Sequence, residues 1–200
     1  MDNPELRAEI VRAAFDLFNR RGYHSATVDD IARRRGMSKR TLYMVFSGKD
    51  EIADAVVVAI LDDFAARFDA VLAQQLGFRE TFRGVFRVAQ EVLTSMSPIF
   101  LEDLERYLPS VFQRILAFRA EHMRRLANVL AAAQSAGEVR PDVRTGLVID
   151  ILLAAVQETG RPEWLHAAGI GFPELIDTVE RLFLYGVCCA PSGSEASANV

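Results

Sequence analysis

Basic side chains that could neutralise phosphate or pair with a nucleic-acid base concentrate in one short segment of this 200-residue chain. Arginine and lysine donate hydrogen bonds to phosphate oxygens, and both can pair with O6 and N7 of guanine. Residues 20–49 contain eight basic residues and only two acidic ones, Asp29 and Asp30. This segment therefore has a net charge of +6, and the rest of the chain has a net charge of −10. This asymmetry favours a basic contact surface on an acidic body over an ordinary solvated charged face. The eight basic residues are Arg20, Arg21, Arg33, Arg34, Arg35, Lys39, Arg40 and Lys49.

Two short helices joined by a tight turn are predicted to position these side chains, over about residues 27–46. Thr27 followed three residues later by Asp30 is typical of a capped helix start. Gly36 allows a sharp turn because glycine tolerates positive φ. Ser38 then predicts the cap of a second short helix. Such a helix-turn-helix places its second helix in the major groove of DNA.

The rest of the chain is also predicted to be helical, which gives an all-α fold of about nine helices. Apolar residues recur at three- and four-residue steps through most of it, and we find no convincing strand or repeat. Residues 160–172, which contain three glycines and a proline, are expected to form a loop or a broken helix. No apolar run is long enough for a membrane span, and the N-terminus lacks a secretory signal, so we expect a cytoplasmic protein without a membrane partner.

Residues 10–52 resemble the TetR family of bacterial transcriptional regulators. The matching motifs are AA-x-x-LF, GY-x-x-T, V-x-DIA, G-x-SK, TLY-x-x-F and K-x-x-I, which occur in order at the family's spacing. Each motif alone is weak, but the whole string is specific. The resemblance implies a three-helix DNA-binding head, placed at residues 4–64. It also implies an α-helical effector-binding and dimerisation body, placed at residues 65–190, and a polar tail at 191–200 is expected to be disordered.

The resemblance further implies a homodimer that binds a near-palindromic operator in double-stranded DNA. Most members of the family are repressors, and a small-molecule effector in the body releases them from DNA. One alternative is a constitutive DNA-binding regulator with no ligand. Another is an enzyme or lipid carrier that has kept the head as a relic, which the basic helix of residues 39–46 disfavours. We expect no catalytic residue, cofactor or metal, because no catalytic, nucleotide-binding or metal-ligand motif occurs.

Residues of the helix-turn-helix are the candidates for DNA contact. Thr27 and Ser38 open helices, whose free N–H groups attract phosphate, although both could serve only as caps. Arg40 is the first choice for a base contact, with a phosphate contact as the alternative, and Lys49 is expected to bind phosphate or to be merely solvated. Val45 stands where many family members have an aromatic residue, so no hydrogen bond is expected from it. The candidates are Thr27, Arg35, Ser38, Lys39, Arg40, Thr41, Tyr43 and Lys49.

Aromatic residues of the body are candidate effector contacts, although an aromatic residue at helical spacing is more often part of the core. Their number favours an apolar or aromatic effector. The candidates are Phe82, Phe86, Phe100, Leu104, Tyr107, Phe112 and Trp164.

Apolar faces of helices predicted at 144–159 and 173–187 suit a four-helix bundle between two subunits. The candidate dimer residues are Leu147, Ile151, Leu152, Ala155, Leu175, Val179, Leu182 and Phe183. The adjacent Cys188 and Cys189 make no metal-ligand spacing, and we expect reduced structural thiols, with redox sensing as the alternative.

Overall fold

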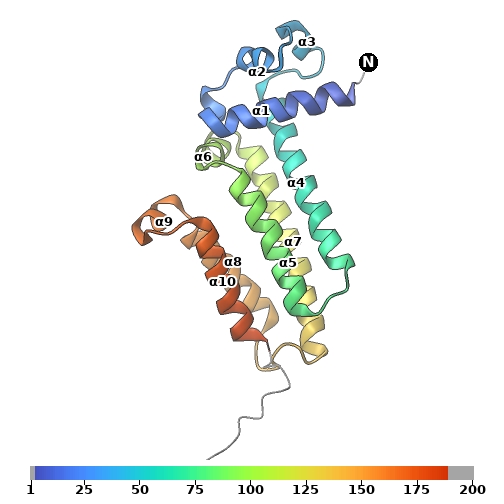
Figure 1. Cartoon of the computed structure of the whole chain (residues 1–200), viewed down its shortest axis with the longest axis vertical. Coiled ribbons are helices and arrows are strands. Elements are labelled where there is room, and N and C mark those ends of the chain that lie inside the picture. The colour runs from blue at the N-terminus through green and yellow to red at the C-terminus, as the bar shows by residue number, and fades with distance from the viewer. Residues whose placement is uncertain (1–2, 189–200) are drawn as a thin grey trace, which may run out of the picture. The chain divides into compact units, whose positions relative to one another are not determined.

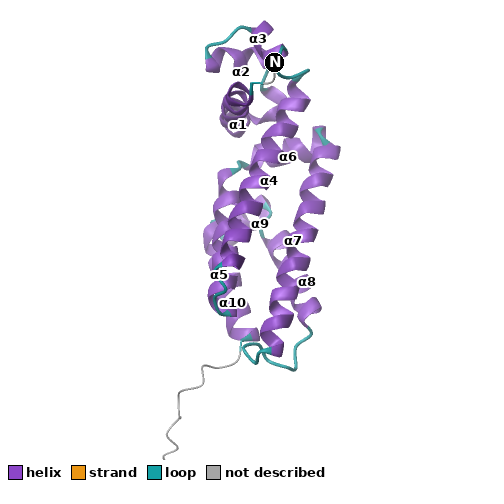
Figure 2. Cartoon of the chain, turned by 90° about the vertical axis from the view of Figure 1, so that its right-hand side faces the viewer, coloured by secondary structure: helices purple, strands orange, loops and turns teal. Residues whose placement is uncertain are grey.

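The computed structural model describes residues 3–188, except the side chains of residues 162 and 163; Cys189 and the tail 191–200 lie outside the described residues. The described part forms ten α-helices and no strand (Figures 1 and 2). This confirms the all-α prediction, and no helix among residues 3–188 is long and apolar enough to cross a membrane. The helices are α1 (Pro4–Ser25), α2 (Val28–Arg35), α3 (Lys39–Tyr43), α4 (Lys49–Ala73), α5 (Phe78–Ser95), α6 (Pro98–Tyr107), α7 (Pro109–Ser135), α8 (Thr145–Thr159), α9 (Pro162–Ala168) and α10 (Phe172–Val187).

The helix beyond the predicted nine is α9, in the segment expected to be a loop or a broken helix. Proline in its first turn has the φ that a helix requires and lacks only an N–H that would have no helical partner there. Gly169 ends it in the left-handed conformation, with φ 68°. The glycine and proline that suggested a loop are therefore the start and stop signals of a helix of seven residues.

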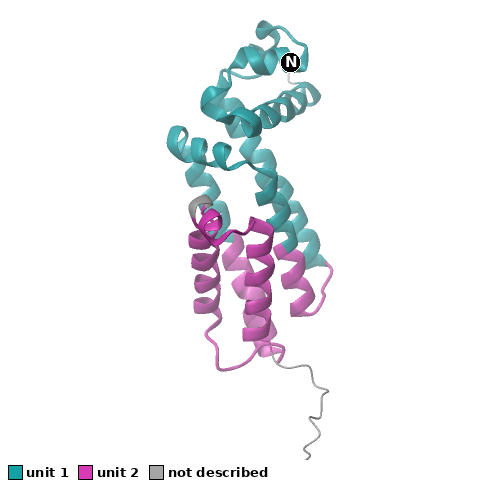
Figure 3. Cartoon of the chain, turned by 60° about the vertical axis from the view of Figure 1, so that its left-hand side comes forward, with its two compact units in different colours: residues 1–73, 87–121 teal, residues 74–86, 122–200 magenta. Residues whose placement is uncertain are grey.

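The helices form two compact units that do not follow chain order (Figure 3). Unit 1 comprises residues 1–73 and 87–121, and unit 2 comprises residues 74–86 and 122–200. The chain passes between the units within α5 and within α7. The predicted boundary between head and body at residues 64 and 65 divides α4 and stays a prediction.

The core of unit 1 begins with the inward face of α1. Ile10, Ala14, Leu17 and Phe18 recur at three- and four-residue steps, and at most 6% of each residue is exposed. They pack with buried residues of α2 and α4 and with Phe46, which follows α3. Burial of one such large side chain contributes about 1.5–3 kcal/mol, so these contacts hold the short helices α2 and α3 against α1 and α4.

The second face of α1 packs on α6. Asn19 of α1 donates to the carbonyl of Ser95 at 2.7 Å and accepts from the N–H of Ser97 at 2.9 Å. Phe100 and Leu104 of α6 are fully buried in the same core, where the Phe100 ring lies 5.5 Å from that of Phe18. These two residues were predicted to contact an effector. Their side chains join α6 to α1, and the predicted effector contact stays a prediction.

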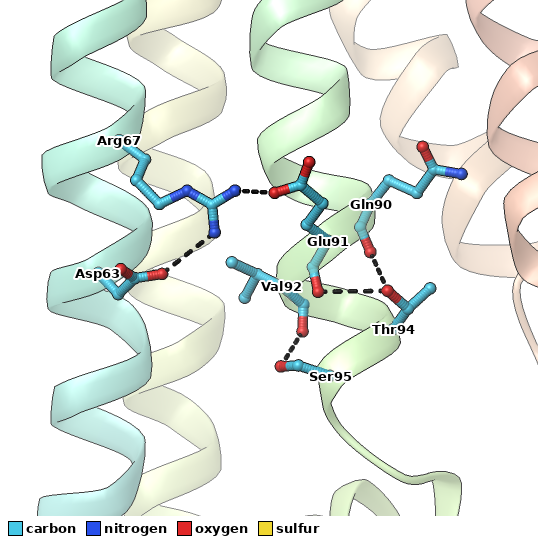
Figure 4. Close-up of polar contacts among 7 residues, drawn as sticks. All are labelled: Asp63, Arg67, Gln90, Glu91, Val92, Thr94 and Ser95. Carbon is cyan, nitrogen blue, oxygen red and sulfur yellow. Dashed lines mark hydrogen bonds and ion pairs between the residues drawn. The ribbon is translucent and has the colours of Figure 1, made fainter.

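An ion-pair bridge links α4 to α5 within unit 1 (Figure 4). The guanidinium of Arg67 on α4 pairs with Glu91 on α5, and it also contacts Asp63 one turn earlier on α4, at 3.3 Å. The carboxylates of Asp63 and Glu91 are 60% and 53% exposed, so the bridge contributes little to stability. It joins α4 to α5 near the end of α4.

Unit 2 contains the pair α8 and α10, which lie side by side in Figure 1 and contact one another. The first half of α5 packs on α10, where the ring of Phe82 stacks on that of Phe183 with centroids 4.6 Å apart. Phe82 also stacks on Phe86 at 4.4 Å. Phe82 is fully buried, so it packs as core.

The predicted dimer residues divide into three groups by exposure. Leu152 and Leu175 are only 4% exposed and pack within their own chain, and their place in a dimer interface stays a prediction. Leu147, Ile151 and Leu182 are 51%, 60% and 71% exposed, as an unpartnered apolar face would be. Ala155, Val179 and Phe183 are half-buried.

The other predicted effector residues are scattered. Phe112 packs partly buried against the core of unit 1. Tyr107 is 37% exposed at the end of α6, where it stacks on His24 with centroids 4.4 Å apart. Trp164 is 43% exposed on α9. Unit 1 has an apolar groove whose walls come from α1, α4 and α5. None of the seven predicted effector residues lines this groove.

Candidate nucleic-acid interface

The first helix of the helix-turn-helix, α2, begins with a reciprocal cap. The hydroxyl of Thr27 accepts from the N–H of Asp30 at 3.1 Å, and the Asp30 carboxylate accepts from the N–H of Thr27 at 3.2 Å. The Thr27 hydroxyl also donates to that carboxylate at 2.6 Å. These bonds hold the pKa of Asp30 below its ordinary value. The predicted cap is confirmed, and the predicted phosphate contact of Thr27 stays a prediction.

The turn and the cap of α3 also form as predicted. Gly36 adopts the left-handed conformation, with φ 72° and ψ 32°, and its N–H bonds back to the end of α2. The hydroxyl of Ser38 accepts from the N–H of Thr41 at 3.0 Å, and the two hydroxyls lie 2.8 Å apart. Leu42 is fully buried. The inward side of α3 is therefore anchored, and its other side is free to meet a ligand.

The outward side of α3 presents a cation beside an aromatic ring. Arg40 is exposed, and within the described residues its side chain has no hydrogen-bond or ion-pair partner. Tyr43 is 47% exposed, and Met44, directly after the helix, is 77% exposed. A guanidinium can pair with guanine, and apolar groups can contact the thymine methyl. This is the surface that a reader of the major groove requires.

Lys39, the first residue of α3, is held in an ion pair. Its ammonium lies 2.9 Å from a carboxylate oxygen of Asp29 in the first turn of α2. Both side chains are 53% exposed. The hydrogen bond and the charge of Asp29 raise the pKa of Lys39. This contact joins α2 to α3, and nothing in the sequence pattern indicated it.

The arginines at the end of α2 pair with α1. Arg34 lies 2.8 Å from Asp16, and the Nε and Nη2 groups of Arg35 both donate to Glu9. Together with Arg12 they line a polar groove of about 440 Å³. Arg35 was predicted to contact DNA. In the structure its guanidinium joins α2 to α1, and the predicted DNA contact stays a prediction.

Lys49 has a role that the sequence did not indicate. Its ammonium donates to the carbonyls of Tyr23, His24 and Ala26 at 3.0, 3.2 and 2.9 Å, and it lies 4.2 Å from the centre of the Tyr23 ring. Burial lowers its pKa. These contacts occupy the three donors of the ammonium, so Lys49 caps the end of α1, and the predicted phosphate contact stays a prediction.

The assembled surface consists of a short exposed helix, held by two caps and a left-handed glycine, that carries Lys39, Arg40 and Tyr43. A protein that reads DNA sequence uses such a helix to neutralise phosphate and to form hydrogen bonds with the edges of the bases. No group of three or more potential metal ligands occurs in the described part of the chain. Fold and site together therefore define a helix-turn-helix DNA-binding regulator.

Comparison with known proteins identifies the family. Residues 10–56 match the model described as "Bacterial regulatory proteins, tetR family". The chain belongs to the TetR family of transcriptional regulators.

Three similarities illustrate the relationship. The HTH-type transcriptional repressor KstR2 of Rhodococcus jostii (strain RHA1) is 25% identical, over 89% of this chain and 87% of that protein. The HTH-type transcriptional activator FasR of Mycolicibacterium smegmatis is 37% identical over 79 residues, which cover 40% of this chain and 36% of that protein. A solved TetR/AcrR-family regulator from Thermobifida fusca superposes with a TM-score of 0.69 at 24% identity, covering 91% of this chain and 98% of that one.

Proposed function

We propose that this DNA-binding regulator is a homodimeric repressor of a near-palindromic operator, and that a small apolar or aromatic effector releases it. The observation that carries the proposal is the exposed face of α3, where Arg40 has no partner within the described residues. The similarity to a named repressor along most of the chain supports repression. A cytoplasmic location is part of the same proposal.

Dimerisation is proposed through α8 and α10. TetR-family regulators dimerise in general. Leu147 and Ile151 on α8, and Leu182 and Tyr185 on α10, are 51–82% exposed and have large apolar side chains. Burial of apolar side chains is the main driving force of association. Helices α8 and α10 of one subunit, packed symmetrically on the same two helices of a second subunit, would form a four-helix bundle. Two α3 helices would then meet successive major grooves, about 34 Å apart.

The proposed release is a shift between two arrangements of the body, one of which spaces the heads wrongly for DNA. Two connections within unit 1 support this. The first turns of α4 lie in the head core through Ile52, Ala53 and Val56. The second connection is α6, where Asp103 accepts from the N–H of His24 at 2.7 Å. A ligand that moved either helix would therefore move the head.

Selection of genomic fragments by the purified protein, followed by thermal-shift screening of apolar compounds, tests the proposal. We expect a salt-sensitive, sequence-preferring complex, and at least one compound that both raises the melting temperature and weakens that complex. Failure to enrich any fragment would overturn the DNA-binding function. Enrichment without any such compound would favour the constitutive regulator, and activation in a reporter assay would refute repression.

A further inference from the structure

The ion pair between Asp29 and Lys39 places an acidic group on the surface that faces DNA. Asp29 lies in the first turn of α2, two residues after the Thr27 cap, and Lys39 is the first residue of α3. Negative charge on a DNA-binding surface repels phosphate, and a paired lysine has to leave its partner before it can neutralise phosphate. Asp29 is also not needed for the cap of α2, because Thr27 and Asp30 make that cap.

We propose that Asp29 restrains the DNA affinity of the head, because it holds Lys39 in an ion pair that operator DNA displaces and other DNA leaves intact. The inference rests on the proposed function of the head as an operator reader. Arg40 beside it has no such partner within the described residues. One cation of α3 is thus available to all DNA, and the neighbouring cation is available only where the contacts are good enough to replace Asp29.

The physical basis is competition between two exposed partners for one ammonium. An exposed ion pair of this kind changes an equilibrium by roughly two- to fivefold, so it can be displaced by a well-placed phosphate or base. Non-specific binding depends almost entirely on phosphate neutralisation. Operator binding has to break the pair and so loses the full free energy of the pair, whereas non-specific binding loses only the weaker contact that Lys39 would otherwise make. Asp29 therefore lowers operator affinity at least as much as non-specific affinity.

Asp16→Asn is a matched control for the test variant Asp29→Asn. Each substitution removes one carboxylate charge from the head, and each releases one cation from an exposed ion pair. Asp16 lies on α1, paired with Arg34, whereas Asp29 is paired with the first residue of α3. A general effect of net charge would be equal in the two variants, and an effect through Lys39 would occur only in Asp29→Asn.

The experiment measures affinity and its salt dependence for two duplexes, one of random sequence and one recovered by the protein from genomic fragments. For Asp29→Asn, we expect random-sequence affinity to rise roughly two- to fivefold per subunit. The slope of log K against log salt steepens by about 0.9 per subunit. Operator affinity rises by at least as much, because operator binding no longer has to break the ion pair. Asp16→Asn should not change the affinity for either duplex to a comparable extent.

A second comparison, in a Lys39→Ala background, separates release of the lysine from simple removal of a negative charge. The effect of Asp29→Asn should largely disappear there. The inference is overturned if the effect persists in full, if Asp16→Asn reproduces it, or if Asp29→Asn leaves random-sequence binding unchanged. Failure of the wild-type chain to prefer any genomic fragment would instead refute the operator-binding function, and the random-sequence measurements would still test the ion pair.

Discussion

Substitution of Lys49 by methionine removes the ammonium that caps α1 and keeps most of the apolar stem. Three carbonyls lose a donor. The Tyr23 carbonyl keeps a bond from the N–H of Ala26 at 3.3 Å, and the carbonyl of the exposed His24 can be hydrated. Ala26 is only 1% exposed, so its carbonyl bears most of the loss.

Loss of a hydrogen bond from a charged donor costs about 1.5–3 kcal/mol. For a chain of this size, each kcal/mol lowers the melting temperature by about 2–4 °C, so Lys49→Met should melt about 3–12 °C below wild type. Thermal unfolding followed by circular dichroism measures the shift. Lys39→Met is the control: its exposed ion pair predicts a stability change below about 1 kcal/mol together with weaker DNA binding.

The opposite pattern would refute this reasoning. If Lys49→Met melts within about 1 °C of wild type and its salt dependence of DNA binding falls by about 0.9 per subunit, Lys49 is a phosphate ligand, as the sequence suggested. DNA binding by the destabilised variant has to be measured well below its melting temperature, so that unfolding does not imitate the loss of a contact.

Further substitutions test other parts of the structure. Thr27→Ala should destabilise the head by about 1 kcal/mol in chemical denaturation. The pKa of Asp30 is lowered in the folded state, so its ionised carboxylate stabilises the fold at pH values above its ordinary pKa. This stabilisation is lost as the pH falls through the folded-state pKa. Asp30→Asn should therefore make the fall in stability at acid pH less steep. Gly22→Ala, at φ 78° and with a Cβ 2.5 Å from Asp103, should cost about 1–3 kcal/mol; an unchanged melting temperature would contradict this. Leu182→Asp should convert dimer to monomer in sedimentation, at a cost on the order of 3 kcal/mol to association, with unchanged helicity; a persistent dimer would place the interface elsewhere.

The features that the sequence predicted correctly in the helix-turn-helix are local ones. The caps at Thr27 and Ser38 join residues three positions apart, and the left-handed turn needs only glycine at position 36. Burial of Leu42 follows from helical periodicity within a short segment. These features depend on neighbours along the chain, so the order of residue types is enough to predict them.

The features that the sequence missed depend on tertiary packing. The Lys49 ammonium contacts carbonyls 23–26 residues earlier, and Arg35 pairs with Glu9, 26 residues away. No periodicity encodes which lysine caps a distant helix. The same holds for Phe100, because an apolar face of α6 could line a cavity or pack on α1 with an identical sequence pattern.

Arg40 is the residue through which α3 is proposed to read DNA sequence. The most direct measurement compares wild type with Arg40→Ala on a duplex recovered from genomic fragments and on random-sequence duplex, at matched salt. One lost base contact of this kind should weaken operator binding by about 1–3 kcal/mol per half-site, about 5- to 150-fold, and random-sequence binding far less. Equal losses on both duplexes would assign Arg40 to phosphate, and unchanged binding to both would contradict the claim that this face of α3 is the reading surface.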